Sequence, residues 1–447
     1  MRNLYFFALL AGLLLPAGGW GQPGFNQAYD YGYPRNQFYK ILVVNDTVVA
    51  YGLARQDTSP SQQCLFVARL DSSGQQIDHR LICHPDGWPY AADMLWSSIS
   101  ATTDGGYALT AFTFSTYDGM MVKLRADLSV EFIRVFRDSV NLVEFYRFVV
   151  ERPNGYLLTG DVQRPNFQLQ PFIRKVDKTG ETEWFMYVGD EALYDNFPGI
   201  DTRGDTLLLV GGQIDGDITL PENTSPRIML FDMHEEDILY EQVLSGREGD
   251  YFISGRFVED MGFIAQGLKL TSTQPLNRYL PFVLRADTNW NIQNTLYGTT
   301  IPNSGPFLRQ IIPMTDSTLL AVGQQASANP NVEVGSYGWL WAFSSSADSL
   351  WELKMYAPLA NGPNSGHYLG GVGRLSSGNL IAGGYASSLG NVYPWLVKIT
   401  PDGCVDDLWC APVVSAAPEP AYAVPALEVR VYPNPASGWV QLELPFL

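Results

Sequence analysis

The chain contains 447 residues, of which 46% are hydrophobic, 13% aromatic and 17% charged, a composition that is typical of a globular protein and excludes a disordered chain. Its formal net charge of −18 at pH 7 repels phosphate backbones and anionic lipid headgroups, so we expect no nucleic-acid partner and no binding to membrane surfaces. The 42 glycines and 29 prolines indicate many tight turns between short strands.

Residues 1–21, MRNLYFFALLAGLLLPAGGWG, have the three parts of a secretory signal peptide. Arg2 provides a positive start, residues 4–15 form the apolar stretch, and GWG at 19–21 is the small-residue cleavage region. The apolar stretch is shorter than the roughly 18 residues of a membrane-spanning helix, and no later segment reaches that length. We therefore expect export of a chain that starts near Gln22, is secreted or displayed on the outer cell surface, and has no membrane-spanning segment.

A short motif, represented by NGYLLTG at residues 154–160, occurs seven times along the chain. Each copy has a turn rich in Asn, Asp, Gly or Ser, followed by an almost continuous apolar strand. This pattern is typical of a hairpin that leads into a strand buried on both faces. The copies lie about 50 to 60 residues apart, and they end at Gly52, Ala111, Gly160, Gly211, Gly267, Gly323 and Gly384.

Each unit also has a strand before the motif, and after it a variable loop, a third strand and a more polar fourth strand. Four antiparallel strands repeated at this period are typical of propeller blades. The predicted fold class is all-β: a seven-bladed β-propeller of four-stranded antiparallel blades over residues 22–411, with eight blades as the alternative. We expect residues 25–40 to pair with the short last blade and close the ring, and the small residue of the motif to permit close packing or a bend.

Four cysteines in an exported chain indicate disulfides. Cys404 and Cys410 lie close together in DGCVDDLWC, and Cys64 and Cys83 flank a predicted hairpin centred on residues 71–74. We predict both pairings, and we expect the bridge between Cys404 and Cys410 to fix the seam of the ring.

An acidic residue follows the third strand in five of the units. We interpret these carboxylates as acceptors for backbone N–H groups in the hairpin turns, with calcium ligation as the alternative. No other cofactor or metal site is predicted, and no catalytic residue, since the chain lacks G-x-S-x-G, H-E-x-x-H and phosphate-loop motifs. The five residues are Asp71, Asp127, Asp177, Asp232 and Asp287.

Aromatic residues in variable loops are the best indication of a binding function. Side chains of Trp and Tyr provide stacking surfaces for sugars and anchors for protein partners. Packing between blades is the alternative role for any one of them. The candidates lie in HPDGWPYAADMLW (84–96) and GSYGWLW (335–341), and they are Trp88, Tyr90, Trp96, Tyr337 and Trp339.

The C-terminal part of the sequence differs from the repeats in composition and in strand pattern. Residues 412–427 are rich in Ala and Pro without a strand period and predict an extended linker. Residues 428–447 contain VYPNPASG followed by an alternating strand, with Tyr432, Pro433, Asn434, Pro435 and Gly438 in the motif. This segment resembles the start of the C-terminal sorting domain of the type IX secretion system, which implies the type IX secretion machinery as a partner. Two strands cannot bury a core by themselves, so we expect this sorting domain to be truncated.

Together these features predict an exported, monomeric binding module for an extracellular glycan or protein. The alternative is an extracellular hydrolase or lyase that acts on polysaccharides through carboxylates in the propeller funnel. Two close carboxylates in the funnel, or an arginine with a carboxylate, would favour the enzyme. A flat aromatic patch would favour the binding module.

Overall fold

The structure is a computed structural model, and it describes residues 24–57, 62–92, 97–137, 143–164, 168–189, 193–215, 223–244, 247–258, 262–272, 278–298, 307–326, 335–360, 365–405, 410, 430–433 and 440–443. Every secondary-structure element assigned in these residues is a β-strand, which confirms the all-β prediction. The predicted signal peptide and linker lie outside the described residues.

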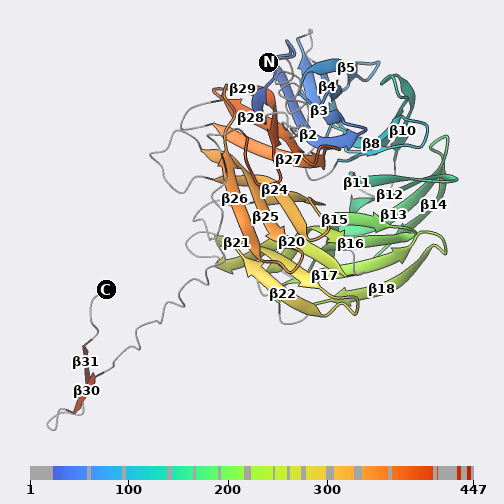
Figure 1. Ribbon diagram of the computed structural model, residues 1–447. Coiled ribbons are helices and arrows are strands. Elements are labelled where there is room, and N and C mark those ends of the chain that lie inside the picture. The colour runs from blue at the N-terminus through green and yellow to red at the C-terminus, as the bar shows by residue number, and fades with distance from the viewer. Residues whose placement is uncertain are drawn as a thin grey trace, which may run out of the picture.

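Seven antiparallel sheets stand around a ring, which confirms the predicted seven-bladed propeller (Figure 1). Within blades 1 and 3 to 6 the strands lie side by side in chain order. Blade 1 comprises β2 (Arg35–Val44), β3 (Thr47–Gln56), β4 (Gln62–Leu70) and β5 (Gln76–Ile82). Blade 2 comprises β6 (Tyr90–Ala91), β7 (Ile99–Ala101), β8 (Tyr107–Thr113), β9 (Gly119–Leu124) and β10 (Val130–Phe136). Blade 3 comprises β11 (Val143–Arg152), β12 (Gly155–Gln163), β13 (Leu169–Asp177) and β14 (Thr182–Tyr187).

The other four blades have the same design. Blade 4 comprises β15 (Tyr194–Arg203), β16 (Thr206–Ile214), β17 (Thr224–Asp232) and β18 (Asp237–Val243). Blade 5 comprises β19 (Asp250–Phe257), β20 (Phe263–Ser272), β21 (Arg278–Ala286) and β22 (Ile292–Tyr297). Blade 6 comprises β23 (Phe307–Pro313), β24 (Thr318–Ala326), β25 (Ser336–Ser344) and β26 (Ser349–Met355). Blade 7 comprises β27 (Gly366–Arg374), β28 (Leu380–Ser388), β29 (Asn391–Ile399) and the N-terminal strand β1 (Phe25–Ala28).

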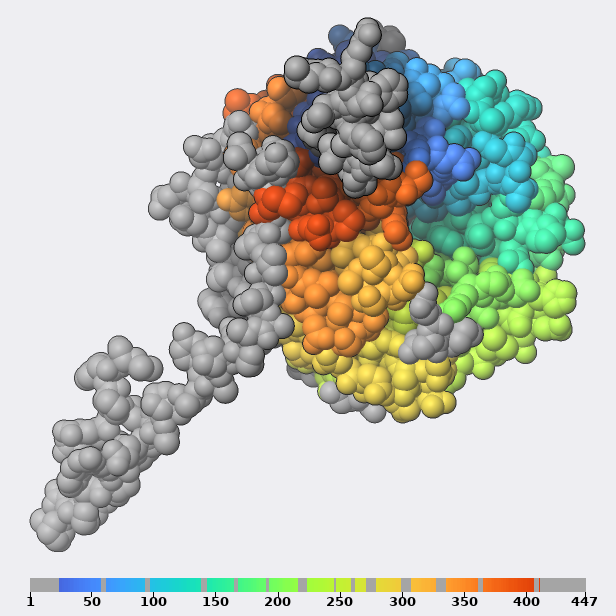
Figure 2. All heavy atoms as spheres, in the orientation of Figure 1, coloured from blue at the N-terminus to red at the C-terminus, as the bar shows by residue number. Residues whose placement is uncertain are grey.

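The ring is closed by β1, which pairs with β29 so that Phe25 lies opposite Lys398. Figure 2 shows the consequence, because the first and last colours of the chain meet at this seam. The expectation that residues 25–40 pair with the last blade holds only for their first part, since β2 already begins at Arg35 and belongs to blade 1. Both predicted disulfides are present, Cys64–Cys83 and Cys404–Cys410.

The core is divided among the blade interfaces. Seven clusters of buried apolar side chains occur, and each joins the facing sheets of two neighbouring blades. In the cluster between blades 4 and 5, for example, Leu208 and Val210 pack with Phe252, Phe263 and Phe282. Burial of apolar area in every interface stabilises the ring, which leaves the loops at both ends free to vary.

The glycine that ends the repeated motif has a common structural cause in six blades. At each of these glycines an added Cβ would lie within 1.7–2.1 Å of a backbone oxygen on the first strand of the blade. The first strand bulges at the same place, as between Asn196 and Gly199 opposite Gly211. Blade 2 has Ala111 instead, and there the first strand is divided into β6 and β7, which pair with β8 on either side of this position. The small residue thus makes room for the bulge.

The recurring aspartates have the predicted role in the turns. Each accepts a hydrogen bond from the backbone N–H two residues further on, at 2.7–2.9 Å, and these bonds contribute to lowering the pKa of each carboxyl. Beyond the propeller, β30 (Arg430–Pro433) and β31 (Val440–Glu443) pair as a two-stranded sheet. Of the predicted sorting motif, Tyr432 and Pro433 lie in β30, whereas Asn434, Pro435 and Gly438 lie outside the described residues.

Candidate functional site on the two faces of the propeller

The first strands of neighbouring blades contact one another around the axis, and their common direction gives the propeller two different faces. On the loop face the first strands begin, and the loops that join the second and third strands lie there. On the hairpin face the first strands end and turn back into the second strands. The sequence places its longer connections mainly on the loop face, which makes that face the more variable one.

An aromatic patch occupies the loop face over blades 1 to 3. It surrounds a cavity of about 330 Å³ and is formed by Tyr39, Phe112, Phe114, Tyr117 and Phe145, with Gln37 and Gln63 as polar neighbours. Two of the rings reach the surface, since Phe114 is 52% and Tyr117 is 40% exposed. The ring of Tyr117 stacks on Phe112 with centroids 6.1 Å apart, and the ring of Phe145 meets Phe112 edge-on at 5.5 Å. The arrangement is a supported aromatic surface and not isolated exposed rings.

The turn between β8 and β9 holds Tyr117 in an unusual backbone conformation. Its φ is +54°, in the left-handed region that bulky residues rarely adopt. The turn is fixed by the N–H of Tyr117, which donates to the carbonyl of Thr113 at 2.8 Å, and by the hydroxyl of Thr116, which donates to Asp118 at 2.6 Å. Arg137 also donates to the Asp118 carboxylate at 2.7 Å. Strain that is held by surrounding bonds in this way is typical of functional surfaces.

A second cavity of the loop face, of about 270 Å³, lies nearer the axis between blades 3 and 6. Its wall includes four aromatic residues, Tyr194, Tyr251, Tyr279 and Phe307. The hydroxyl of Tyr251 donates to the side-chain oxygen of Asn196 at 2.5 Å, and burial raises the pKa of this phenol.

Beneath this cavity, Arg147 forms a buried ion pair with Asp161. Burial raises the pKa of the Asp161 carboxyl, and the neighbouring guanidinium opposes that rise. The pair positions Arg147 where it lines both this cavity and the axial channel of about 140 Å³.

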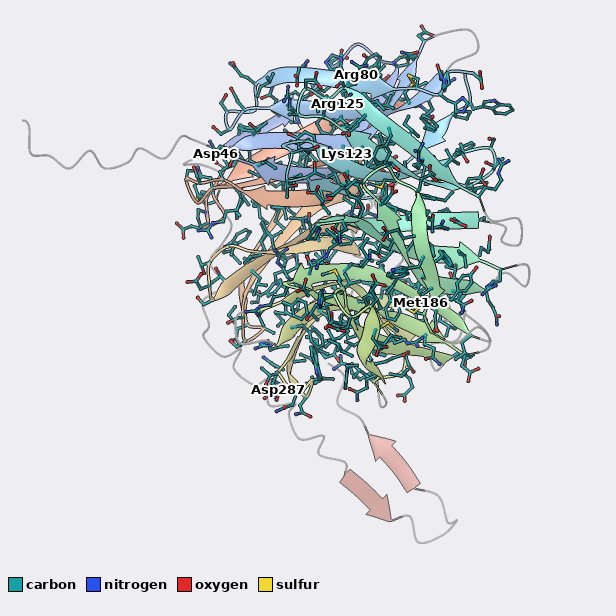
Figure 3. All side chains as sticks on the ribbon, turned by 90° about the vertical axis from the view of Figure 1, so that its right-hand side faces the viewer. Asp46, Arg80, Lys123, Arg125, Met186 and Asp287 are labelled. Carbon is teal, nitrogen blue, oxygen red and sulfur yellow. A yellow bond between two sulfur atoms is a disulfide. The ribbon has the colours of Figure 1, made fainter. Side chains whose placement is uncertain are left out.

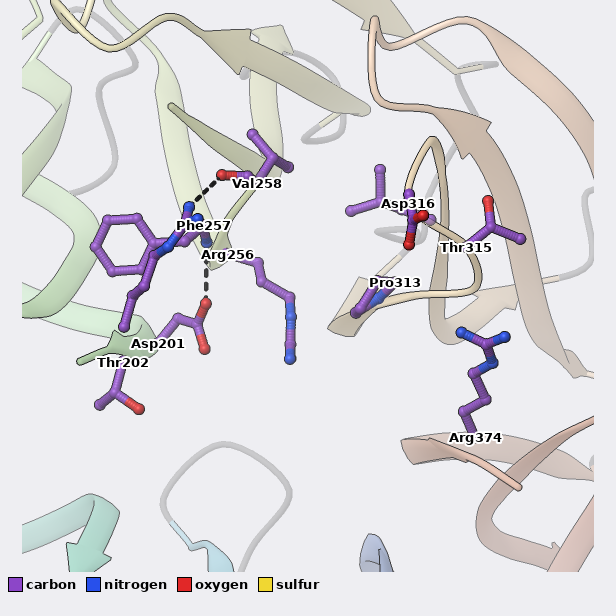
Figure 4. A pocket seen from close by; sticks show the side chains of 11 residues that line it. Asp201, Thr202, Arg256, Phe257, Val258, Pro313, Thr315, Asp316 and Arg374 are labelled. Carbon is purple, nitrogen blue, oxygen red and sulfur yellow. Dashed lines mark hydrogen bonds between the residues drawn. The ribbon is translucent and has the colours of Figure 1, made fainter. Parts of the chain in front are cut away.

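The hairpin face contains a cavity of a different character, here called the arginine pocket. It measures about 320 Å³ and lies at the ends of the first strands of blades 4 to 7. Arg203, Arg256 and Arg374 line it together with Asp201 and Asp316 (Figure 4). The backbone N–H of Phe257 donates to Asp201 at 2.9 Å.

Burial raises the pKa of the Asp201 carboxyl, while Arg256 and the Phe257 N–H oppose the rise. The pocket therefore combines arginine with carboxylate, the combination that would favour catalysis.

The five aromatic residues predicted from the sequence have different positions. Trp88 is 55% exposed and borders the aromatic patch, because the next residue, Pro89, accepts a hydrogen bond from the N–H of Phe114 at 3.0 Å. Tyr90 and Trp339 are buried, at 3% and 2% exposure, and pack between blades, which corrects their assignment as surface binders. Tyr337 is half-buried, and Trp96 lies outside the described residues.

Phe114 and Tyr117 were not predicted, although they lie in a variable loop, FTFSTYDG at 112–119. Arginine also recurs in the sequence at the ends of the first strands, and this recurrence could have indicated the arginine pocket. Among the described residues, no group of three or more His, Cys, Asp and Glu side chains is placed to hold a metal ion. The same residues contain no helix long and apolar enough to cross a membrane.

No protein-family model matches the chain, and no curated protein matches its sequence. Among solved structures, a puromycin hydrolase superposes with a TM-score of 0.54 at 14% identity, over 90% of this chain and 57% of that chain. A puromycin-hydrolyzing peptidase of Mycobacterium tuberculosis has a TM-score of 0.49 at 9% identity, over 80% of this chain and 53% of that one. An exo-β-1,3-galactanase from Clostridium thermocellum has a TM-score of 0.35 at 10% identity, over 84% of this chain and 95% of that one.

These comparisons bear on the fold. The likeness to the puromycin hydrolase shows the propeller architecture alone, because the identity is low, and this chain spans 57% of the length of that enzyme. The peptidase and the galactanase superpose too loosely to support an argument about this chain. Function therefore has to be argued from the two faces.

Proposed function

We propose that the propeller is the binding module of an exported protein and that its aromatic patch recognises an extracellular glycan. The observation that carries the proposal is the exposure of Phe114 and Tyr117 on a supported aromatic surface. Rings of this kind stack on the apolar faces of sugars and lose little conformational freedom on binding. The side-chain oxygens of Gln37 and Gln63 supply hydrogen-bond acceptors for hydroxyl groups, while their amide nitrogens donate to the Tyr39 hydroxyl and the Tyr90 carbonyl.

The proposal includes the route by which the protein reaches its ligand. Residues 1–21 direct export, and residues 428–447 act as the start of a type IX sorting domain that delivers the protein to the outer cell surface or the medium. The signal-peptide pattern and the VYPNPASG motif support this route. Its test is the location of the protein in its native host, with and without the motif.

A second candidate function is a hydrolase or lyase acting on extracellular polysaccharides. The observation in its favour is the arginine pocket, where Asp201 and Asp316 share a cavity with three arginines. In such a site a carboxylate would act as acid or base, and a guanidinium would stabilise developing negative charge. The aromatic patch supports binding more directly, so the enzyme remains the alternative.

The chain starting at residue 22, with oxidised disulfides, is tested against immobilised extracellular polysaccharides and proteins. Retention and soluble fragments are both measured. We expect retention on a polysaccharide without fragments, and at least tenfold weaker binding, or about 1.4 kcal/mol, for Phe114→Ala and for Tyr117→Ala. Tyr297→Ala is the matched control, because this tyrosine is 43% exposed on the outer strand of blade 5.

The outcomes separate the alternatives. Equal retention of the Phe114→Ala variant and the unaltered chain contradicts the role of the aromatic patch. Fragment release that persists through purification establishes the enzyme instead. Retention on a protein but on no polysaccharide would show that the ligand is a protein and not a glycan.

A further inference from the structure

The arginine pocket concentrates positive charge in a chain of net charge −18. Three of its lining residues are arginines and two are aspartates, so cations outnumber anions among the lining residues. The charged side chains come from the first strands of blades 4, 5 and 7 and from the turn that follows the first strand of blade 6. Four blades thus contribute to one cavity on the hairpin face, which is separate from the aromatic patch.

Two of the guanidinium groups are available to a ligand. Arg203 donates to the backbone carbonyl of Val258 at 2.6 Å and is thereby held against the wall. Arg256 and Arg374 extend from blades 5 and 7 into the space between the walls in Figure 4. Among the described residues neither of these two donates a hydrogen bond or lies within ion-pair distance of a carboxylate, although the charge of Arg256 also acts on the Asp201 carboxyl. A guanidinium group presents paired N–H donors that match the two oxygens of a carboxylate.

The remaining lining groups restrict the kind of anion. Asp201 and Asp316 repel a multiply charged ligand but accept hydrogen bonds from hydroxyl groups. Pro313 adds an apolar surface to the blade 6 side of the cavity, against which the face of a sugar ring can pack. A ligand with one carboxylate, several hydroxyls and a compact ring satisfies all three features. The cavity of about 320 Å³ is at the lower end of small-ligand pockets, which suits one sugar residue.

We propose that the arginine pocket binds a hexuronic acid residue of an acidic glycan, with its carboxylate held between Arg256 and Arg374. This site is distinct from the aromatic patch and does not depend on it. It shares with the proposed function only the assumption that the ligand is a glycan.

The test is titration calorimetry of the chain starting at residue 22 with a trigalacturonate and, in parallel, with neutral galactotriose. We expect binding of the acidic sugar and at least tenfold weaker binding of the neutral one. Arg256→Gln and Arg374→Gln should each weaken trigalacturonate binding at least tenfold. Arg80→Gln should leave it unchanged, because Arg80 is exposed on β5, the outermost strand of blade 1 (Figure 3).

Two further variants keep the result interpretable. Arg374→Lys retains the charge but not the paired donors, and we expect it to bind more weakly than the unaltered chain. Phe114→Ala should bind trigalacturonate normally. If this variant also kept full retention on the polysaccharide, that result would count against the proposed function and not against this site. Thermal unfolding of each variant excludes loss of the fold as the cause.

Each remaining outcome overturns the proposal. Absence of trigalacturonate binding does so, and so does unchanged binding by a correctly folded Arg256→Gln variant. Equal affinity for galactotriose would show that the carboxylate is not recognised. Tighter binding of inorganic phosphate or of an acidic peptide would assign the pocket to a different anion.

Discussion

Substitution of alanine for Gly211 tests the explanation of the repeated glycine. A Cβ at this position would lie 1.9 Å from the carbonyl oxygen of Asn196, and 2.8 Å from both the carbonyl carbon of Asn196 and the Cα of Phe197. All three neighbours are backbone atoms, so no change of side-chain rotamer can relieve the contact. The two strands must move apart instead.

The cost follows from that movement. Since a real Cβ is essentially never found closer than 3.0 Å, the carbonyl has to move by about 1 Å. Overpacking of this kind costs about 1–3 kcal/mol, and each backbone hydrogen bond weakened beside the bulge costs about 1 kcal/mol more. We therefore expect Gly211→Ala to lower the free energy of unfolding by about 3–5 kcal/mol, a large share of the stability of an ordinary domain.

The assay is equilibrium unfolding in urea, with Ala111→Gly as the reciprocal control. Ala111 is fully buried where the first strand of blade 2 is interrupted, so glycine there creates no clash. Loss of one buried methyl and the added freedom of the unfolded chain should cost less than about 2 kcal/mol. A Gly211→Ala protein within 1 kcal/mol of the unaltered chain would refute the steric explanation.

Two other predictions concern the disulfides and a buried histidine. Removing the bridge between Cys64 and Cys83, which are 19 positions apart, should lower the free energy of unfolding by about 3 kcal/mol. Removing the bridge between Cys404 and Cys410, which closes a shorter loop, should lower it by about 2 kcal/mol. Urea unfolding of the two double serine variants measures both losses, and a larger loss for the shorter loop would contradict the chain-entropy argument. Burial lowers the pKa of His367, so below about pH 6.5 the unfolded chain takes up a proton that the folded chain excludes. The free energy of unfolding should therefore decrease as the pH is lowered, by at most about 1.4 kcal/mol per pH unit. His367→Gln should flatten the dependence of the unfolding free energy between pH 6.5 and 5, and an unchanged slope would exclude His367 as its source.

The blades were predictable because their signals are local. Turn residues, apolar strands and the spacing of motifs such as NGYLLTG determine hairpins, and seven similar hairpin units have few ways to bury their apolar faces except against one another. The bulge opposite Gly211 was not predictable in detail, because it depends on the register of a strand paired across the blade. The sequence signalled only that a small residue was needed.

The sites were harder to predict because exposure is a property of the assembled ring. Trp88 and Trp339 both lie in loop-like aromatic stretches, yet one is exposed and the other is packed against Trp341 within an interface. The arginine pocket has a partial signal, since Arg203, Arg256 and Arg374 all lie at the ends of first strands. Their convergence on one cavity follows from the circular arrangement and cannot be read from their separation in sequence.

The closure of the ring by β1 has a consequence for the order of folding. Strand β1 must wait for the strand with which it pairs, since Phe25 meets Lys398 only when β29, at the other end of the propeller sequence, is in place. Until then one edge of blade 7 lacks a neighbour, and such an edge is open to pairing with other chains. Loop closure over so long a distance is slow compared with hairpin formation. We therefore expect the seam to be the last part of the ring to form, and a peptide with the sequence of residues 24–29 should compete with β1 for the edge of β29.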